Sequence, residues 1–253
     1  MVRGFFQEIA ALTGFTIDFF KASGKRPFEF KEFLRQCYKV GNTSLLLITL
    51  TGFILGVVLT LQSRPVLAEF GAESWLPMMV ASSIVIEIGP VVTALICAGK
   101  VGSSIGAELG SMRVTEQIDA MEVSGTYPMR YVVVTRVLAC TLMIPLLTFY
   151  SDAVSFLGSY VGVNMHTQVS FTFFIDQIFA SFQFDDLIPA TIKTFFFGFA
   201  IGIVGSYKGY NAGRGTEGVG SAANSAVINA SLAVFIIDLI AVQITQLVIK
   251  YLG

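Results

Sequence analysis

The sequence predicts an all-α integral membrane protein, with amphipathic helices at the N-terminus followed by five transmembrane helices. Of its 253 residues, 54% are hydrophobic and 13% are charged, and the mean hydropathy is +0.74. A soluble domain carries roughly a quarter charged residues, so this much apolar surface indicates lipid as the solvent. The apolar residues are also gathered into five long stretches, which polar segments separate.

The remaining composition excludes several classes of function. The net charge is −1, and no basic cluster with interleaved aromatic residues occurs, which argues against nucleic-acid binding. His166 is the single histidine, so a His-based metal site or a Ser-His-Asp triad is not expected. The phosphate-binding G-x-x-x-x-G-K-[ST] pattern and the HExxH and GxSxG motifs are missing. We therefore expect a non-catalytic chain with no cofactor or metal of its own.

Residues 1–40 mix aromatic and charged residues at helical spacing, a pattern typical of helices that lie in the membrane interface. Gly24 and Pro27 predict a break between two such helices. The alternative for this segment is an amphipathic helix docked on a soluble domain.

Residues 41–253 are predicted to form the five-helix domain. Residues 44–62 carry no charge and are long enough to cross a hydrocarbon core of about 30 Å. In the second span, Gly89-Pro90 predicts a kink near the middle. In the third, Arg136 and Asp152 predict margins that extend beyond the hydrocarbon. The predicted spans are about 44–62, 76–99, 131–163, 187–205 and 222–249.

The basic residues predict the orientation. Thirteen of the sixteen Lys and Arg residues fall on one side of the predicted spans, namely Arg3, Lys21, Lys25, Arg26, Lys31, Arg35, Lys39, Lys100, Arg113, Arg130, Arg136, Lys208 and Arg214. Because basic loops stay in the cytoplasm, we expect a cytoplasmic N-terminus and an outward-facing C-terminus.

Three ionisable residues, Glu87, Lys193 and Asp238, lie within predicted spans. Each would cost at least about 2.5 kcal/mol if it faced lipid at the centre of a helix, so we expect them to face protein, water or one another. The least costly arrangement pairs an acid with Lys193. Such a pair can serve only to fix helix register, or it can take part in transport, and the pattern leaves both open.

The cytoplasmic segment between the second and third spans contains a predicted helix at about 107–124, which ends near Gly125. Its apolar residues form a stripe, and charged residues, including Arg113, Glu116 and Asp119, lie away from that stripe or at its edge. This pattern fits an ordinary loop helix as well as a helix that docks a partner.

Longer motifs resemble a known family. They are Glu87-Ile-Gly-Pro-Val-Val-Thr-Ala-Leu-Ile, Ala98-Gly-Lys-Val-Gly-Ser and Gly106-Ala-Glu-Leu-Gly-Ser-Met-Arg-Val-Thr-Glu-Gln-Ile-Asp-Ala-Met-Glu, followed by Gly209-Tyr, Gly218-Val-Gly, Ala226-Val, Ser231 and Asp238. From about residue 30 onwards, the chain resembles the MlaE permease family.

The resemblance implies the membrane subunit of an ABC complex in the bacterial inner membrane. Such a complex moves phospholipid between the inner and outer membranes and helps to maintain outer-membrane lipid asymmetry. The implied partners are a second copy of the chain, a cytoplasmic ABC ATPase that binds ATP-Mg, a periplasmic MCE-domain protein and, in some members, a STAS-domain protein. The direction of lipid movement and the head-group preference stay open.

The resemblance also implies roles for individual residues. Arg113, Glu116, Asp119 and Met121 match the family's coupling element, which contacts the ATPase. Glu87, Lys193 and Asp238 match its intramembrane charged positions, although Ile86 stands where homologues can carry a basic residue, which predicts a smaller charge network here. Leu59, Leu67 and Phe70 match its lipid-cavity region.

Two other functions fit the same residues. An ion-driven secondary transporter would use Glu87, Lys193 and Asp238 as a relay, although no inverted repeat is evident among the five spans. A membrane anchor for an MCE-domain protein would need no lipid pathway at all.

Overall fold

The computed structural model describes residues 2–25, 28–182 and 184–252, and every regular element in these ranges is a helix. Within the same ranges, five helical segments are long and apolar enough to cross a membrane: Phe30–Glu69, Glu73–Val114, Met129–Asn164, Asp185–Tyr210 and Gly215–Val248. Each covers one predicted span, except that the fifth prediction ends one residue later. The prediction of an all-α protein with five transmembrane helices is therefore confirmed.

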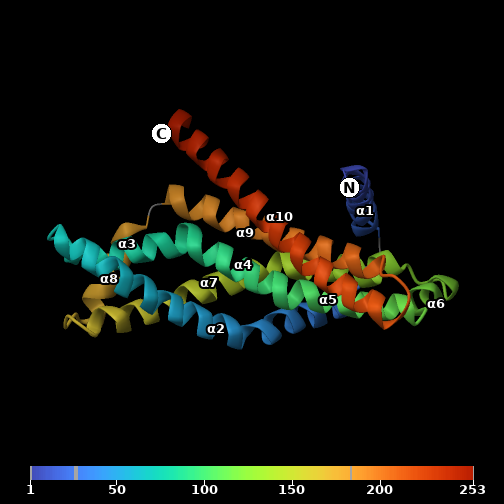
Figure 1. The fold of residues 1–253 in the computed structure, drawn as a ribbon, viewed down its shortest axis with the longest axis horizontal. Helices are drawn as coiled ribbons and strands as arrows, with labels where there is room; N and C mark the ends of the chain where they lie inside the picture. The colour runs from blue at the N-terminus through green and yellow to red at the C-terminus, as the bar shows by residue number, and fades with distance from the viewer. Residues whose placement is uncertain (1, 26–27, 183, 253) are drawn as a thin grey trace.

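The long helices form one elongated bundle (Figure 1). α2 (Phe30–Glu69), α7 (Thr135–Asn164) and α9 (Phe184–Tyr210) run along its length, and α10 (Gly215–Leu252) leaves it at an angle, so that the C-terminus projects from the bundle. The short helix α8 (Phe171–Ser181) packs against α3 (Leu76–Ser83) at one end. α6 (Gln117–Val123) lies at the other end.

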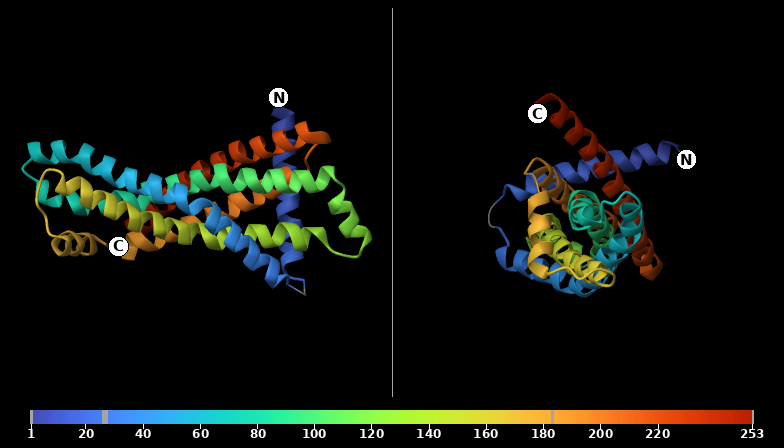
Figure 2. Two further views of the ribbon diagram at one scale, coloured as in Figure 1. Left: turned by 90° about the horizontal axis from the view of Figure 1, so that it is seen from below. Right: turned by 90° about the vertical axis from the view of Figure 1, so that its left-hand side faces the viewer.

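α1 (Val2–Ser23) is not parallel to the long helices but runs across them, as both views in Figure 2 show. Phe15, Phe19 and Ala22 are buried against the main core, whereas Ile17 and Phe20 are exposed. A helix with apolar residues on both its inner and outer sides suits a position at the membrane interface, which stays a prediction. Arg26 and Pro27, the latter of which marked the predicted break, lie outside the described residues.

The second predicted interfacial helix is not a separate element. Residues 30–40 are the first turns of α2, which continues through residue 40 without a break. No proline follows until Pro65, and Cys37 and Val40 are already buried in the bundle. Gly41 sits so close to α7 that an added Cβ would lie 2.9 Å from Cε of Met143. Packing against α7 therefore begins before residue 44, the predicted start of the span.

The second span consists of several helical segments. α3 is followed by a π-helical turn at Ile84–Ile88 (η2), by α4 (Gly89–Cys97), by a second π-helical turn at Ala98–Gly102 (η3) and by α5 (Ser103–Val114). Pro90 lies two residues after the end of η2 and has no N–H to donate to the preceding turn. At the predicted kink the chain thus forms a π-helical turn, in which the N–H of Gly89 donates to the carbonyl of Ile84.

The third span begins with the π-helical turn η4 (Met129–Val134) and continues as α7. Arg136 and Asp152 do not mark where this helix leaves the hydrocarbon, because both side chains are buried between helices, with 4% and 6% exposure. Both side chains therefore face protein rather than bulk water.

Glycine and serine residues bring α2 and α7 into backbone contact. An added Cβ on Gly56 would lie 1.9 Å from the carbonyl oxygen of Ser155, and one on Gly158 would lie 2.1 Å from that of Phe53. The hydroxyl of Ser155 donates to the carbonyl of Gly52 at 2.9 Å. Small residues at both surfaces permit this approach, a common way for helices to associate in lipid.

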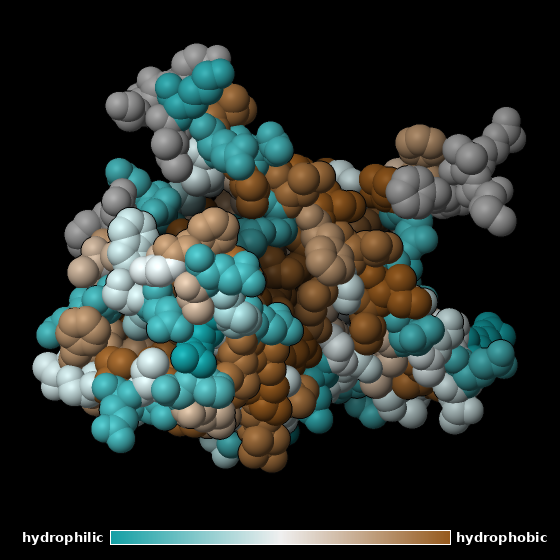
Figure 3. Space-filling model, turned by 60° about the vertical axis from the view of Figure 1, so that its left-hand side comes forward, coloured by the Kyte–Doolittle hydropathy of each residue, from teal (hydrophilic) through white to brown (hydrophobic). Residues whose placement is uncertain are grey.

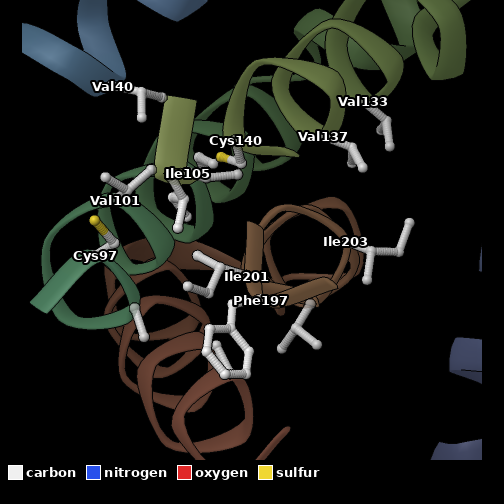
Figure 4. Close-up of a cluster of buried hydrophobic side chains, with 14 of the residues drawn as sticks. Val40, Cys97, Val101, Ile105, Val133, Val137, Cys140, Phe197, Ile201 and Ile203 are labelled. Atoms are coloured by element: carbon white, nitrogen blue, oxygen red, sulfur yellow. The ribbon is translucent and has the colours of Figure 1, made fainter. Parts of the chain in front are cut away.

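The main hydrophobic core lies between α4, α5, α7 and α9. Figure 4 shows Val101 and Ile105 lying beside Cys140 of α7, with Phe197 and Ile201 of α9 closing the cluster. All three cysteines, Cys37, Cys97 and Cys140, are buried and free, and they pack as small apolar side chains. A second, smaller cluster lies at the end of the bundle that carries α3 and α8.

The outer surface matches a lipid-facing protein. Figure 3 shows a band of hydrophobic side chains across one face, with hydrophilic side chains mainly on either side of it. Exposed apolar residues on α10 include Leu232, Phe235 and Leu239, each more than half exposed. Much of α10 therefore has no protein neighbour within a single copy of the chain.

Candidate functional site

The three charged residues of the predicted spans meet at one point. Nζ of Lys193 lies 2.6 Å from Oε2 of Glu87 and 3.0 Å from Oδ1 of Asp238. Glu87 comes from η2, Lys193 from α9 and Asp238 from α10, so the contact joins three spans. We call these three residues the ion cluster. The expected pairing of an acid with Lys193 is present, and the lysine has two carboxylate partners.

The helices place the cluster well inside the spans. Lys193 lies eight residues after the start of the fourth span, and Asp238 lies ten residues before the end of the fifth. At about 1.5 Å per residue, these positions are roughly 12 and 15 Å from those ends. Because α9 and α10 are antiparallel neighbours, the two side chains reach the same level, in the half of the bundle away from α6.

The three members of the ion cluster differ in exposure, and the cluster contains more acidic than basic groups. The side chain of Lys193 is 5% exposed and that of Asp238 is 13% exposed, but that of Glu87 is 43% exposed. Two carboxyl groups share one ammonium group, so the cluster has room for one added proton or cation at Glu87, its open member. A buried lysine without a counter-charge would be strongly destabilising, which explains why two acids converge on it.

Glu87 opens onto a groove of about 210 Å³ between η2, α9 and α10. Its walls combine apolar residues with a few polar ones, namely Ile86, Glu87, Asp186, Pro189, Ala190, Lys193, Ala241, Val242, Thr245 and Gln246. A mostly apolar groove with a few convergent polar groups is the usual form of a small-molecule site. Asp186 also lines this groove, so the lining residues include two acids and one base.

The predicted cytoplasmic helix at 107–124 is two helices rather than one. α5 extends from the second span to Val114, and α6 begins at Gln117. Glu116 between them has a φ of 58°, which lies in the left-handed region and interrupts the helical hydrogen bonding. The correction is that residues 107–114 belong to the membrane helix, and only α6 is a separate connecting helix.

The end of α6 agrees with the prediction. Gly125 has a φ of 78°, the N–H of Thr126 donates to the carbonyl of Met121 at 2.9 Å, and the N–H of Gly125 donates to that of Glu122 at 3.1 Å. This pair of bonds is the Schellman motif, which requires the left-handed conformation that glycine adopts without strain.

The four predicted coupling residues occupy different environments. Arg113 forms a salt bridge with Asp119, which holds α6 against the end of α5. Glu116 is exposed, whereas Met121 packs partly against the main core. Val123 was not predicted, although it is 91% exposed and apolar at the end of α6. Its only sequence signal is its place on the side of α6 away from the buried Ile118.

A second charged cluster at the α6 end of the bundle was also missed. Nζ of Lys39 lies 2.7 Å from Oε2 of Glu108, and the guanidinium of Arg136 lies 3.1 Å from Oε1 of the same carboxylate. Lys39 belongs to α2, Glu108 to α5 and Arg136 to α7. Glu108 therefore ties three helices together, and only their folding reveals that these distant residues meet.

α1 is held to the bundle by a third ionic contact. The carboxylate of Glu8 accepts hydrogen bonds from Lys208 of α9 and, at 3.0 Å, from Nδ2 of Asn229 on α10. The hydrogen bond from Lys208 lowers the pKa of Glu8, although partial burial opposes this shift. The contact links the N-terminal helix to the two helices that carry Lys193 and Asp238.

Two of the three predicted lipid-cavity residues lie against one hydrophobic cluster, and the third does not. Leu59 and Leu67 pack against the smaller hydrophobic cluster at the α3–α8 end. Phe70, just after α2, is 79% exposed. Leu59 and Leu67 thus take part in packing within the chain, and Phe70 faces outward from it.

The five-span fold, with a charged cluster between the spans, defines a multi-pass membrane protein. Comparison with known sequences assigns the family: the profile described as permease MlaE matches residues 33–244. The chain belongs to the MlaE permease family.

Named relatives agree with this assignment. The intermembrane phospholipid transport system permease protein MlaE of Haemophilus influenzae is 36% identical over 248 residues, which cover 92% of this chain and 95% of the relative. A probable ABC transporter permease protein of Rickettsia typhi is 36% identical over 226 residues, 89% of this chain and 86% of its own. Another from Synechocystis is 36% identical over 203 residues, 80% and 77% of the two chains. The chain is thus an ABC transporter permease subunit.

Proposed function

We propose that this chain is the membrane subunit of an ATP-driven transporter that moves phospholipid between the bacterial inner and outer membranes. The observation that carries the proposal is the ion cluster of Glu87, Lys193 and Asp238, which opens onto an apolar groove between the spans of an MlaE-family permease. Such a groove suits acyl chains, and its charged end suits a polar head group. The name of the Haemophilus relative supports phospholipid as the substrate.

The proposed location is the bacterial inner membrane, with the α6 end in the cytoplasm. The basic residues support this orientation, because Lys39, Arg113 and Arg136 all lie near that end. The ion cluster and its groove then lie in the outer half of the membrane. This position suits a transporter that exchanges lipid with a periplasmic carrier and helps to maintain outer-membrane lipid asymmetry.

The energy source is a partner ATPase that binds ATP-Mg in the cytoplasm. α6 is the proposed contact, with Glu116 and Val123 exposed to the partner and the Arg113–Asp119 salt bridge fixing the helix on α5. Because Met121 packs on the main core, a push on α6 is transmitted to the spans rather than absorbed by a mobile loop. Its role is therefore to transmit motion, not to bind nucleotide.

The other proposed partners act in the membrane and on its outer side. A second copy of the chain packs on the exposed face of α10, and a periplasmic MCE-domain protein docks at the α3–α8 end, where Phe70 and Trp75 are exposed. A STAS-domain protein that binds the ATPase completes the assembly in some family members. Phospholipid enters from the membrane or from the MCE-domain protein.

In the proposed cycle, ATP binding draws the two ATPases together and α6 of each permease follows. The two permeases rock about their shared interface, and the outward-facing lipid cavity opens or collapses. Binding energy at the cytoplasmic face thus shifts the populations of two conformations at the outer face.

Reconstitution tests this function. The permease, its ATPase and an MCE-domain carrier are placed in proteoliposomes with a fluorescent phospholipid, and ATP is expected to drive lipid between membrane and carrier. An ATPase variant that cannot hydrolyse ATP is the control. If lipid transfer were equally fast with the inactive ATPase, the ATP-driven function would be wrong.

An ion-driven secondary transporter is the second candidate, because the partly exposed Glu87 beside Lys193 resembles a site that binds and releases a proton. In the same proteoliposomes, transport that continues without the ATPase but stops when the proton gradient is dissipated would favour it. A complex that holds the MCE-domain protein and never moves lipid would instead identify the chain as a membrane anchor.

A further inference from the structure

Asp152 lies near the middle of α7, 6% exposed, and its Oδ1 atom is fully enclosed without a hydrogen-bond partner among the residues that the structure describes. An ionised carboxylate in such a place would carry a large desolvation cost with no compensating contact. The carboxyl group is therefore expected to hold its proton. A protonated carboxyl has one O–H group to donate, and in a dry interior that group requires an acceptor.

The side chain points into a narrow space between η2, α4, α7 and α9, with room for about one water molecule. Its lining residues are Val85, Pro90, Pro145, Thr148, Phe149, Asp152, Ala190, Thr191 and Thr194. Two nearby hydroxyl groups already donate their protons to backbone carbonyls: Thr148 to that of Ile144 at 3.0 Å, and Thr194 to that of Thr191 at 2.7 Å. Neither hydroxyl is thus a donor for Asp152.

Gly89 allows the carboxyl group to reach the backbone of the second span. An added Cβ on Gly89 would lie only 2.1 Å from Oδ1 of Asp152 and 2.8 Å from the carbonyl oxygen of Ile84. No other residue type leaves this space open. The Asp152 carboxyl therefore lies against Gly89, the residue between the π-helical turn η2 and Pro90.

This turn also contains a backbone acceptor that has lost its donor. In the π-helical register, the N–H of Gly89 donates to Ile84, so the N–H of residue 90 would donate to Val85. Residue 90 is proline and has no N–H. Val85 is buried and lines the same space as Asp152. Asp152, which has a proton to donate, and Val85, whose carbonyl has lost its donor, thus line the same small space.

We propose that Asp152 is a positioning residue, which keeps its proton and donates it in a hydrogen bond to the free backbone carbonyl of η2, and that this bond fixes the direction of Glu87. Glu87 lies within η2. If the turn changed from the π-helical to the α-helical register, the side chains before it would rotate by about 100° around the helix axis. Such a rotation would take Glu87 away from Lys193. The transport consequence rests on the proposed function, but the proton and the geometry do not.

Infrared spectroscopy of the purified protein at neutral pH tests the proton. The wild-type spectrum is expected to contain a protonated-carboxyl C=O band that is missing in Asp152→Asn. Asp176→Asn, which removes an exposed carboxyl group on α8, is the matched control and is expected to leave the band unchanged. Identical spectra for wild type and Asp152→Asn would overturn the proposal, whether or not the protein transports lipid.

Cross-linking tests the positioning. A membrane-permeant carbodiimide activates the Glu87 carboxyl group. The amine of Lys193 then attacks the activated carbonyl carbon and forms an amide. The activating group leaves as a urea, which carries away the water that the two side chains lose. Peptide mass spectrometry gives the yield. Asp152→Asn keeps a donor and is expected to keep this yield, whereas Asp152→Leu, of similar volume, is expected to lower it by about tenfold.

Lipid transfer by the reconstituted complex is expected to follow the cross-link yield in both variants. Equal cross-link yields in Asp152→Asn and Asp152→Leu would overturn the positioning role. If wild-type complex moved no lipid while the cross-link yields differed as expected, the proposed function would fail and the role of Asp152 would stand. If Asp152→Leu does not fold, a loss of the cross-link in well-folded Asp152→Asn would still overturn the proposal.

Discussion

The Nζ atom of Lys193 lies 2.6 Å from Oε2 of Glu87, although the two residues are 106 positions apart in the sequence. Lys193 also donates to Asp238, so the lysine is the centre of the ion cluster and each acid is a replaceable partner. Lys193 is almost fully enclosed, whereas Glu87 is partly open to the groove. The three residues therefore differ in what their loss does to stability and to transport.

Lys193→Met is expected to destabilise the protein, because it leaves two carboxyl groups facing each other without their counter-charge. The expected loss is about 3 kcal/mol in the free energy of unfolding, typical of a broken buried ion pair. Glu87→Gln keeps the Lys193–Asp238 contact, so its stability should stay within about 1 kcal/mol of wild type while lipid transfer falls. Denaturant unfolding in detergent gives the first quantity, and reconstituted transfer gives the second.

Lys31→Met, which removes an exposed lysine from the start of α2, serves as the control for lost positive charge. Normal ATP-driven transfer by Glu87→Gln would show that this carboxylate only holds the helices together. Reduced transfer with unchanged stability would instead indicate a role in the transport cycle.

Backbone strain at Glu116 predicts a stabilising substitution. Its φ is 58°, and this left-handed conformation is unfavourable by about 1 kcal/mol for a residue that has a Cβ atom. Glycine adopts the same conformation without this cost. Glu116→Gly should therefore raise the free energy of unfolding by up to about 1 kcal/mol, and Gly125→Ala, at a φ of 78°, should lower it by a similar amount. Thermal unfolding of the two variants measures both changes.

Glu116→Gly also distinguishes the effect of backbone strain on stability from the effect of a contact with the ATPase. If Glu116 touches the ATPase, Glu116→Gly should weaken ATPase binding or uncouple ATP hydrolysis from lipid transfer even though the isolated permease becomes more stable. A more stable permease with normal coupling would remove Glu116 from the proposed contact.

Hydropathy and charge were enough to predict the five spans. The free-energy cost of a charged side chain that faces lipid was enough to predict that Lys193 has an acidic partner. These features depend on local composition and on a penalty that holds for any fold. The break at Glu116 could not be predicted, because nothing in the residues 107–124 pattern marks a left-handed residue between two helices. Helical periodicity alone continues through it.

The packing partners of distant residues could not be predicted either. Asp152 was interpreted as the edge of a span, but the fold encloses it against Gly89. Glu108 was placed in a cytoplasmic helix, but it joins Lys39 and Arg136 between three helices. In each case the decisive fact is which helix lies opposite, and a single sequence does not contain it.

The contact between Glu8 and Lys208 predicts that acid releases α1. The hydrogen bond from Lys208 lowers the pKa of Glu8 in the folded protein, so the contact contributes stability above the unfolded value, about 4.3, and this contribution is lost as the pH falls through the lower folded value. Hydrogen exchange in α1 should therefore rise below about pH 4. Because Glu8 is partly exposed, high salt should weaken the effect.

Lys208→Met is the matched variant for this prediction. It should show fast exchange in α1 already at neutral pH and little further change on acidification. An unchanged pH profile in Lys208→Met would mean that the burial of Phe15 and Phe19, rather than the ionic contact, holds α1 in place.

The exposed face of α10 predicts where two copies meet. Ile228, Leu232, Phe235 and Leu239 are all exposed and follow one another at intervals of four, three and four residues, as in a seam between two helices. In a chain whose buried cysteines are replaced, Leu232→Cys or Leu239→Cys is expected to form a disulfide-linked dimer in membranes. Leu46→Cys on the exposed face of α2 is the control. Equal dimer formation by all three variants would show that the seam does not select a partner.

The contact between α2 and α7 predicts a strong effect from the smallest possible substitution. A Cβ on Gly56 would lie 1.9 Å from the carbonyl oxygen of Ser155, a backbone atom that cannot move without shifting α7. Gly56→Ala should therefore cost about 1–3 kcal/mol in the free energy of unfolding. Gly14→Ala in α1, with nothing within 4 Å of its Cβ, should instead gain up to about 1 kcal/mol from helix propensity.

The two substitutions add the same methyl group to a helix, so propensity alone predicts the same gain for both. Opposite signs in chemical unfolding would show that close backbone contact decides the result at Gly56. Because Gly52 and Gly158 belong to the same contact, a second substitution there should cost less after Gly56→Ala than in the wild type, once α2 and α7 have separated. Equal costs in both backgrounds would mean that the helices do not move as rigid neighbours.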